Sequence, residues 1–355
     1  MKKRVLIFYL LIICLGCAAV HEKPAAPPEA VFYPPLPQRP RLQFLRSISG
    51  ASDLGKTQSA FQRFLFGPTH DQFLAKPYDV AACKGKIYVL DRMYKKIVII
   101  DLAGRKMSFL DDRGSGSLVD PAGIWVTEEE ITYVADMQRK QVVVFDRNGQ
   151  YLKTYGSPLL FKKPVDVAVY GNRIYVIDLE QEQLFILDRE SGRLIQAVGQ
   201  KGDFFKPSHV TTGPLGNVFV TDAFHFQIKK FSPDGLLLAS TGFHGDQVGG
   251  LARPKGAAVD KAGRLFVVDA AFENVQIFDD LGRVLLFFGG PGNAPGNLYL
   301  PAGIAIDEDN TAYFQKFADP DFKLDQLVYV TNMFGKNMVN VYGFGHWVEP
   351  SVPAE

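Results

Sequence analysis

Two aspartates and one histidine occupy the same position of a repeated sequence pattern. Each copy of the pattern begins at a proline, and the residue two positions after that proline can be compared between copies. In chain order this residue is Asp79, Gly123, Asp166, His209, Gly256 and Gly303. Carboxylates and an imidazole are ligands that divalent metals accept in proteins. The pattern therefore allows a metal site of Asp79, Asp166 and His209. The same residues can also be explained without a metal: glycine is required where inner strands pack closely, and aspartate accepts hydrogen bonds from backbone N–H groups at a strand start.

The six copies follow one another at a period of about 43–47 residues. Each holds a proline-led strand, a second strand ending in a turn residue, and a third such as VVVFD at 142–146; the first five add an outer strand that ends near glycine. Runs rich in β-branched and aromatic residues predict strands, and because they are apolar almost throughout, we expect sheets covered on both faces. A repeat of this length with four strands is typical of a propeller blade. The sequence predicts an all-β, six-bladed β-propeller.

The sixth copy lacks an outer strand, and the chain offers one near its beginning. After VNVYG at 339–343 no such strand follows, whereas RLQFLRSISG at 41–50 resembles an outer strand without a blade of its own. We expect residues 41–48 to lie beside 339–342, so that an N-terminal strand completes the last blade and closes the ring, which removes exposed sheet edges. The predicted propeller spans 41–345 and is followed by a C-terminal tail at 346–355.

Two segments interrupt the regular pattern. Residues 59–67 (SAFQRFLFG) have apolar spacing compatible with one or two helical turns docked on the ring. The sixth copy carries an aromatic-rich insertion at 313–322 between its first and second strands. Its aromatic side chains either pack back on the blade or form a projection that binds a partner.

The N-terminal 17 residues are typical of an export signal. A basic start at 2–4 precedes an apolar run at 5–15, and the segment ends in a Cys-Leu-Gly-Cys sequence that resembles a bacterial lipobox. The resemblance implies cleavage before Cys17, lipidation of that cysteine and, with alanine following it, delivery to the outer membrane. An ordinary signal peptide or an uncleaved anchor is the alternative. Residues 18–40 are rich in proline and predict a semi-rigid tether.

Composition narrows the classes of partner and cofactor. The 355 residues contain 39 Lys and Arg and 38 Asp and Glu, so the formal net charge is +1 and gives no electrostatic footprint for nucleic acid. Of the three cysteines, Cys14 lies in the signal and Cys17 would carry lipid, which leaves Cys83 without an intramolecular partner. We expect a monomer without a cofactor, exported and held at the membrane by its lipid.

The second strands end in aspartates that we interpret as turn formers, because their side chains can bind backbone N–H groups two residues on. These are Asp91, Asp136, Asp178, Asp222 and Asp269. The proline-led strand, this V-x-D turn and the V-x-V-F-D strand together resemble the NHL repeat, over residues 41–345. The chain is similar to exported bacterial six-bladed NHL propellers, an architecture that serves lyases, lactonases and binding platforms alike. The related peptide-amidating lyases use three zinc-binding histidines, whereas this chain places only His209 on the ring.

The loops between second and third strands carry aromatic side chains of the kinds enriched at interface centres. We expect Tyr94, Phe224, Phe226, Phe272 and Phe334 to bind a partner, although such residues can also just cover the top of each blade. The preferred interpretation is a membrane-tethered, non-catalytic propeller that presents this loop face to a protein or peptide in the cell envelope. The alternative is a metal-dependent lyase or lactonase at the mouth of the central channel.

Overall fold

The computed structural model describes residues 30–55, 73–200 and 202–348. The predicted signal peptide, Cys17, most of the tether and the segment at 59–67 lie outside these residues. The folded part belongs to one compact unit that begins at Val31. Within the described residues, no helix combines the length and apolar character that a membrane span needs.

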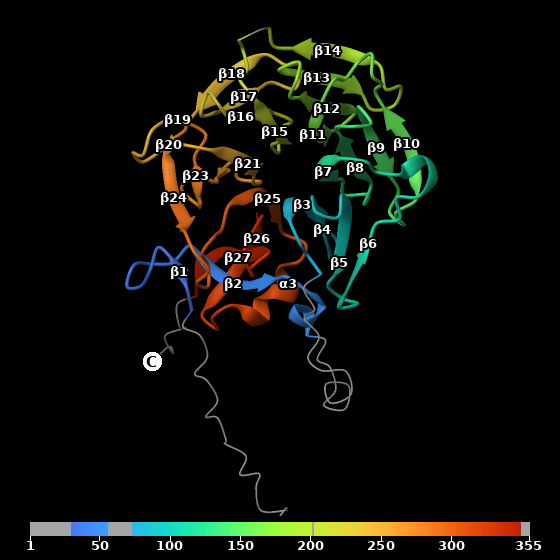
Figure 1. Cartoon of the computed structure of the whole chain (residues 1–355). Coiled ribbons are helices and arrows are strands. Elements are labelled where there is room, and N and C mark those ends of the chain that lie inside the picture. Colours follow the sequence, from blue (N-terminus) through green and yellow to red (C-terminus); the bar gives the residue numbers. More distant parts are fainter. Residues whose placement is uncertain (1–29, 56–72, 201, 349–355) are drawn as a thin grey trace, which may run out of the picture. The chain divides into compact units, whose positions relative to one another are not determined.

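Six antiparallel sheets stand around a central axis, as blades of a propeller (Figure 1). The first three blades contain β3 (Pro77–Cys83), β4 (Lys86–Asp91), β5 (Lys96–Asp101) and β6 (Lys106–Phe109); β7 (Pro121–Val126), β8 (Thr132–Asp136), β9 (Gln141–Phe145) and β10 (Tyr151–Tyr155); β11 (Pro164–Tyr170), β12 (Arg173–Asp178), β13 (Gln183–Asp188) and β14 (Leu194–Val198). The next two contain β15 (Pro207–Thr212), β16 (Val218–Asp222), β17 (Gln227–Phe231) and β18 (Leu237–Thr241); β21 (Pro254–Val259), β22 (Leu265–Asp269), β23 (Asn274–Phe278) and β24 (Val284–Gly289). The proline-led strand of each blade is innermost and contacts the innermost strands of both neighbours.

The sixth blade is completed by the beginning of the folded chain, which confirms the predicted closure. Its strands are β25 (Pro301–Asp307), β26 (Phe322–Asn332), β27 (Val339–Trp347), β2 (Leu42–Ile48) and β1 (Phe32–Tyr33). β2 pairs antiparallel with β27, with Ile48 opposite Val339 and Phe44 opposite Tyr342. The ring therefore joins its first and last blades through main-chain hydrogen bonds, and the six-bladed fold expected from the repeat is confirmed.

The expected domain boundaries shift outward at both ends. β1 pairs with β2 and lies within the segment assigned to the tether, because Phe32 is buried and its ring packs 5.7 Å from that of Trp347. At the other end β27 continues to Trp347, two residues past the predicted limit of the propeller. Local composition favoured an extended linker up to residue 40, but burial of one aromatic side chain recruits its last part into the sixth sheet.

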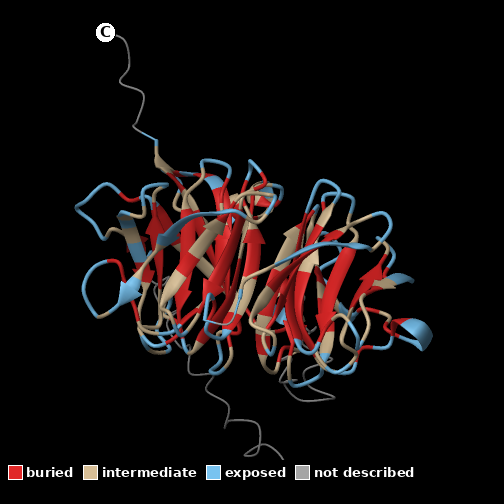
Figure 2. Cartoon of the chain, turned by 90° about the horizontal axis from the view of Figure 1, so that it is seen from above, coloured by how far each residue is buried: buried red, intermediate tan, exposed pale blue. Residues whose placement is uncertain are grey.

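Apolar clusters fill the junctions between neighbouring blades. The described residues form six such clusters, one at each junction, and the one between the last and first blades contains Tyr329 and Val341 together with Val89 and Val98. Figure 2 shows buried residues throughout the strands and exposed residues in the loops at both edges. Each sheet is covered on both faces, which explains why the strands are apolar almost throughout instead of alternating.

The insertion of the sixth blade packs back on the ring. It forms α3 (Thr311–Phe314) and a 3-10 helix, η4 (Gln315–Phe317), in which Phe314 is fully buried and Arg46 lies 4.5 Å above the Phe317 ring. Of the two interpretations of this segment, the structure supports packing over projection. The remaining short elements are η2 (Ala51–Leu54), η3 (Gly114–Gly116), β19 (Phe243–His244) and β20 (Gly250–Leu251).

Candidate functional site

An irregularity after each leading proline turns side chains toward the axis. In all six blades the pairing register shifts just after the proline, between Pro77 and Asp79 in the first blade and between Pro207 and His209 in the fourth. Proline cannot donate to the ladder and is tolerated at a strand start, and a bulge re-aims the residues that follow it. The channel mouth is accordingly lined by residues one or two positions after the leading prolines, whereas Val165 of the third blade packs into the core between blades.

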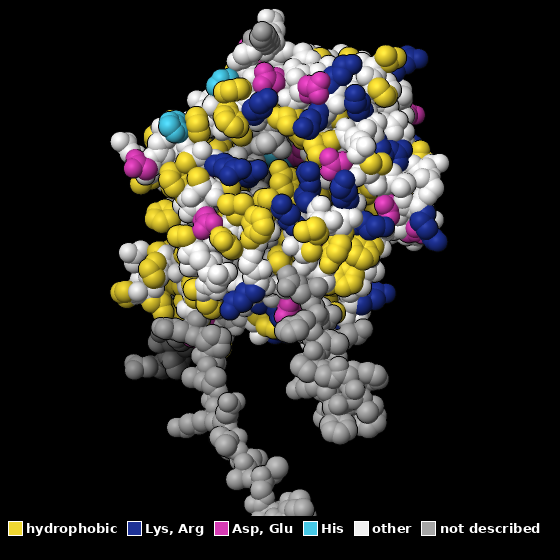
Figure 3. Space-filling view, in the orientation of Figure 1, with side chains coloured by type: hydrophobic (Ala, Val, Ile, Leu, Met, Phe, Trp, Pro, Cys, Tyr) yellow, Lys and Arg dark blue, Asp and Glu magenta, His cyan; other side chains and the backbone are white. Residues whose placement is uncertain are grey.

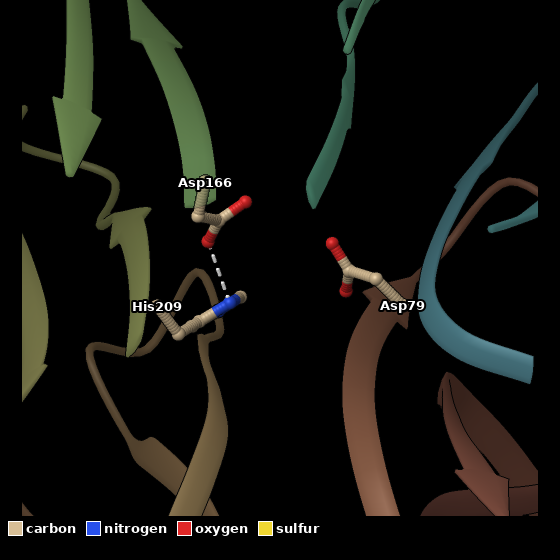
Figure 4. Close-up of side chains that lie close together, drawn as sticks. All are labelled: Asp79, Asp166 and His209. Carbon is tan, nitrogen blue, oxygen red and sulfur yellow. Dashed lines mark ion pairs between the residues drawn. The ribbon is translucent and has the colours of Figure 1, made fainter. Parts of the chain in front are cut away.

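The structure brings together the three residues of the predicted metal site. One ligand atom from each of Asp79, Asp166 and His209 lies within 4.8 Å of those of the other two. Figure 4 shows Asp166 and His209 paired, with the Asp79 carboxyl group facing them from β3 across the channel. The glycines at the equivalent positions have a packing role, since a Cβ on Gly123 would lie 2.0 Å from Asp166 Oδ1.

The two carboxyl groups join neighbouring blades through backbone N–H groups. Asp79 accepts hydrogen bonds from Val80 in its own strand and from Ile124 in the next blade, both at 2.9 Å. Asp166 accepts equivalent bonds from Val167 at 2.9 Å and Val210 at 2.8 Å. Each aspartate therefore binds one N–H of its own blade and one of the next, which makes both of them structural clamps.

His209 donates from both ring nitrogens. Its Nδ1 lies 2.7 Å from Asp166 Oδ2, and its Nε2 lies 2.8 Å from the carbonyl oxygen of Ala257 in the fifth blade. A carboxylate and a carbonyl both accept hydrogen bonds, so both nitrogens carry protons and the ring is an imidazolium. His209 thus links the third, fourth and fifth blades.

The electrostatics of the cluster agree with this protonation state. Burial by itself would lower the pKa of His209, but the charge of Asp166, the hydrogen bond to it and the charge of Asp79 raise this pKa to about 9. Burial and the charge of Asp166 raise the pKa of Asp79 to about 7, against the opposing effect of His209. The cluster therefore holds more protons near neutral pH than the same groups would in water.

This arrangement fits a divalent metal poorly. A metal needs an unprotonated imidazole nitrogen and carboxylate lone pairs directed at one point. Both nitrogens of His209 are occupied as donors, and each carboxyl oxygen of Asp79 and Asp166 already accepts a backbone hydrogen bond. Binding a metal would break the His209 contact to Asp166 or the one to Ala257, and with it a link between blades.

The turn aspartates have the role that the sequence predicted and a second one. Asp91 accepts hydrogen bonds from the backbone of Met93 and Tyr94 in its own turn, and also from Ala75 and Lys76 in the segment that leads into its blade. Asp136, Asp178 and Asp269 repeat both sets of contacts. A fully buried carboxylate thus fixes the loop face in these four blades.

The predicted partner-binding aromatics differ in exposure. Three are open to solvent, namely Tyr94 at 40%, Phe224 at 56% and Phe334 at 46%. Phe226 and Phe272 are half-buried, and the Phe226 ring packs 4.2 Å from His244. Hydrophobic side chains gather in patches over the face shown in Figure 3.

Two exposed aromatics of the same loop face escaped the sequence analysis. Phe205 lies 5.2 Å from the ring of Phe224, and Tyr299 lies 6.4 Å from the ring of Phe334, measured between centroids. Each stands two residues before a leading proline, so comparing that position between copies could have found them. Phe205 with Phe224 on the fourth blade, and Tyr299 with Phe334 on the sixth, therefore form two exposed aromatic pairs.

Asp79 and His209 separate two cavities along the channel. On one side lies a cavity of about 180 Å³, lined by small aliphatic residues, threonines and Trp125. On the other side is a space of about 10 Å³ at the channel mouth, lined by the cluster and by the residues that directly follow the leading prolines, among them Tyr78, Ser208 and Lys255. These three were not singled out from the sequence, because simple strand alternation would direct them away from the axis.

Comparison with known proteins agrees on the fold. Residues 51–163, less than half of the chain, match the DUF5128 family, described as a 6-bladed beta-propeller. No curated protein is significantly similar in sequence. The solved structures of similar fold include a streptogramin B lyase, with 13% identity, a TM-score of 0.54 and coverage of 78% of this chain and 84% of the lyase. Another is an auxiliary nutrient binding protein from Bacteroides ovatus, with 13% identity, a TM-score of 0.56 and coverage of 76% of this chain and 69% of that protein.

At these identities the likeness shows the propeller fold alone. One of these propellers is named a lyase and the other a binding protein, so the fold is compatible with both of the functions expected from the sequence. The choice between a lyase and a binding protein therefore depends on the residues that this chain places at its channel and on its loop face.

Proposed function

We propose that this protein is a lipid-anchored, exported propeller that binds a protein or peptide partner in the cell envelope through its loop face. The observation that carries the proposal is the set of exposed aromatic pairs on this face, Phe205 with Phe224 and Tyr299 with Phe334. Exposed aromatic side chains held on a rigid scaffold lose little conformational entropy on binding and are typical interface anchors.

The rigidity of the loops supports this proposal. The turn aspartates are fully buried and hold both the turn and the preceding blade connection, as Asp91 does for Tyr94 and Lys76. The aromatic side chains are therefore presented from loops whose backbone is fixed before a partner arrives. Such preorganisation raises affinity because fewer loops must be ordered on binding.

The channel supports binding over catalysis. A lyase or hydrolase requires a placed general base or a metal-activated water. Of the residues at the channel mouth, Asp79, Asp166 and His209 are the natural candidates, but they serve as links between blades. A metal-dependent lyase or lactonase stays the second candidate because the three ligand types do lie together, and it requires the cluster to open.

Site-specific photo-cross-linking in the native envelope tests the binding proposal. A photoreactive phenylalanine analogue replaces Phe224, or Phe334, or the equally exposed Phe287 on the outer strand β24 as the control. We expect both loop-face positions to give the same cross-linked partner, and Phe287 to give none. The double substitution F224A/F334A should weaken retention of that partner while leaving the thermal midpoint nearly unchanged, since both side chains are exposed. Equal products from all three positions would refute the loop face as the binding surface.

The anchor is tested separately at Cys17. We expect radiolabelled palmitate to enter the full-length chain and the protein to fractionate with membranes, because the cysteine follows a lipobox-like sequence. The variant Cys17→Ser should lose both label and membrane association. Membrane association without label in the unchanged chain would show that an uncleaved segment serves as the anchor.

A further inference from the structure

Three cationic side chains gather at the channel mouth on the loop face. Lys255 lies with its ammonium group 5.4 Å from the centre of the Tyr78 ring, and the Arg92 guanidinium lies 5.3 Å from the same centre. Arg253, just before the leading proline of the fifth blade, acts electrostatically on both Lys255 and Tyr78. Figure 3 shows Lys and Arg side chains around the central hollow of this face.

The charge of this group is not balanced by its surroundings. Burial lowers the pKa of Lys255, and the charged groups that influence it, Arg253 and Arg92, are both cationic and lower this pKa further. Only Arg92 has an acidic partner, Asp120, at 3.4 Å. Among the described residues, the Lys255 ammonium and the Arg253 guanidinium have no hydrogen-bond or ion-pair partner. Contact with the Tyr78 ring offsets part of the cost, but a cation–π contact is weaker than an ion pair in a desolvated site.

The acidic side chains below the channel mouth do not cancel this positive charge. Asp166 is neutralised by His209, and Asp79 holds a proton part of the time near neutral pH because its pKa is about 7. Both carboxyl groups are bound to backbone N–H groups below the cationic side chains. A ligand that approaches from the loop face meets an excess of positive charge.

A buried hydroxyl group at the same place also lacks a partner. The Ser208 side-chain oxygen is inaccessible to solvent and makes no hydrogen bond, and Ser208 lines the mouth together with Lys255 and Tyr78. Buried polar atoms without partners are rare in native proteins, and each calls for an explanation, a bound water or ion among them. The space beside them, about 10 Å³, accommodates a single atom such as one ligand oxygen.

We propose that the channel mouth is a binding site for an oxyanion group, a carboxylate or a phosphate, held by Lys255, Arg253 and Ser208. One oxygen enters the space at the mouth, and the Ser208 side chain, whose oxygen is out of reach of solvent without a ligand, rotates toward it so that the hydroxyl donates a hydrogen bond. The others face Lys255 and Arg253 and supply the negative charge that the protein itself does not provide. The size of the space directs only the end group of a ligand into the mouth, so the rest of the ligand lies on the loop face. The site does not depend on the proposed partner binding, since a free anion would also occupy it.

Anion binding is measured with inorganic phosphate and, separately, with acetate, against chloride at equal ionic strength. Equilibrium dialysis gives the affinity, and thermal unfolding gives the linked rise in midpoint. We expect Lys255→Met to weaken phosphate or acetate binding about tenfold or more, as loss of a charge-assisted hydrogen bond does. The matched control is Lys163→Gln, which removes the same charge before the leading proline of the third blade, outside the cluster. General stabilisation by phosphate acts on every variant equally and cancels in this comparison.

The stability of the variants in chloride distinguishes a ligand site from a structural one. Without a ligand, Lys255→Met removes a half-buried cation that has no counterion, so the variant should be as stable as the unchanged protein or more stable. Ser208→Ala removes a hydroxyl that has no partner, so it should weaken anion binding without lowering the midpoint. Arg253→Gln, at an exposed position, should fold normally and bind the anion more weakly.

The proposal fails if neither phosphate nor acetate binds more tightly than chloride, or if Lys255→Met and Lys163→Gln bind equally well. It also fails if Lys255→Met and Ser208→Ala both lower the midpoint in chloride, which would show that these side chains have partners within the fold. Binding of acetate would identify a carboxylate as sufficient, and binding of phosphate alone would identify a phosphate group; both outcomes support an oxyanion site.

Discussion

The protonation of His209 provides the sharpest test of how the ring is held together. Its pKa is raised from 6.5 to about 9 because Asp166 lies 2.7 Å from Nδ1 in a buried site. A group with a raised folded-state pKa stabilises the fold fully below its unfolded value and loses that contribution as the pH rises through the folded value. The difference of about 2.5 pH units, at about 1.4 kcal/mol each, corresponds to about 3.5 kcal/mol of unfolding free energy lost between pH 6.5 and 9. Asp79, raised from 3.8 to about 7, acts in the same direction over lower pH.

Two assays report on this prediction. NMR titration of the imidazole Cε1–H resonances gives the pKa directly, and the resonance of His209 is assigned by its absence in His209→Gln. Urea unfolding at a series of pH values gives the linked loss of stability. The control is Asp166→Asn, which removes the charge that raises the pKa of His209. Because burial then dominates, the pKa of His209 in this variant should lie more than one unit below its value in the unchanged protein. The other histidine resonances serve as internal references. A His209 pKa at or below 6.5 in the unchanged protein, or the same value in Asp166→Asn, would refute the imidazolium bridge.

Three further predictions follow from the ring. Leu42→Ala, at a fully buried position of the closing strand, should lower the unfolding free energy by about 2–5 kcal/mol, measured by urea unfolding; a change below about 1 kcal/mol would contradict the observed closure. Gly123→Ala should lower the unfolding free energy by at least about 2 kcal/mol, because the new Cβ would lie 2.0 Å from Asp166 Oδ1. Gly213→Ala should lower it much less in the same assay, because the nearest neighbour of its Cβ is the movable Phe219 ring at 3.1 Å. Purified protein dialysed against zinc or manganese should retain far less than one equivalent by mass spectrometry, because both nitrogens of His209 already donate; one tightly held equivalent that is lost in His209→Gln would favour the enzymatic alternative.

The sequence predicted more of the fold than of the site. The leading prolines and the strand pattern between them indicated six blades, and the unpaired segment at 41–50 indicated how the ring closes. It also grouped Asp79, Asp166 and His209, because equivalent positions of a repeat lie at equivalent distances from the axis. It did not show that backbone N–H groups of the next blade occupy the two carboxyl groups, since those contacts join residues that lie about 44 positions apart.

The sequence by itself determined the four-stranded blade, the number of blades and the closure of the ring. It could do so because strands of a meander pair with their neighbours in the chain, so each blade appears as one period of the sequence pattern. Only the tertiary structure decided what the axis holds. Tyr78, Ser208 and Lys255 come from three different blades, and they meet because a bulge follows the leading proline in each of these blades and the ring brings the three bulges together. The sequence pattern of one blade cannot predict this group of side chains, since the net charge at the axis depends on residues from all six blades.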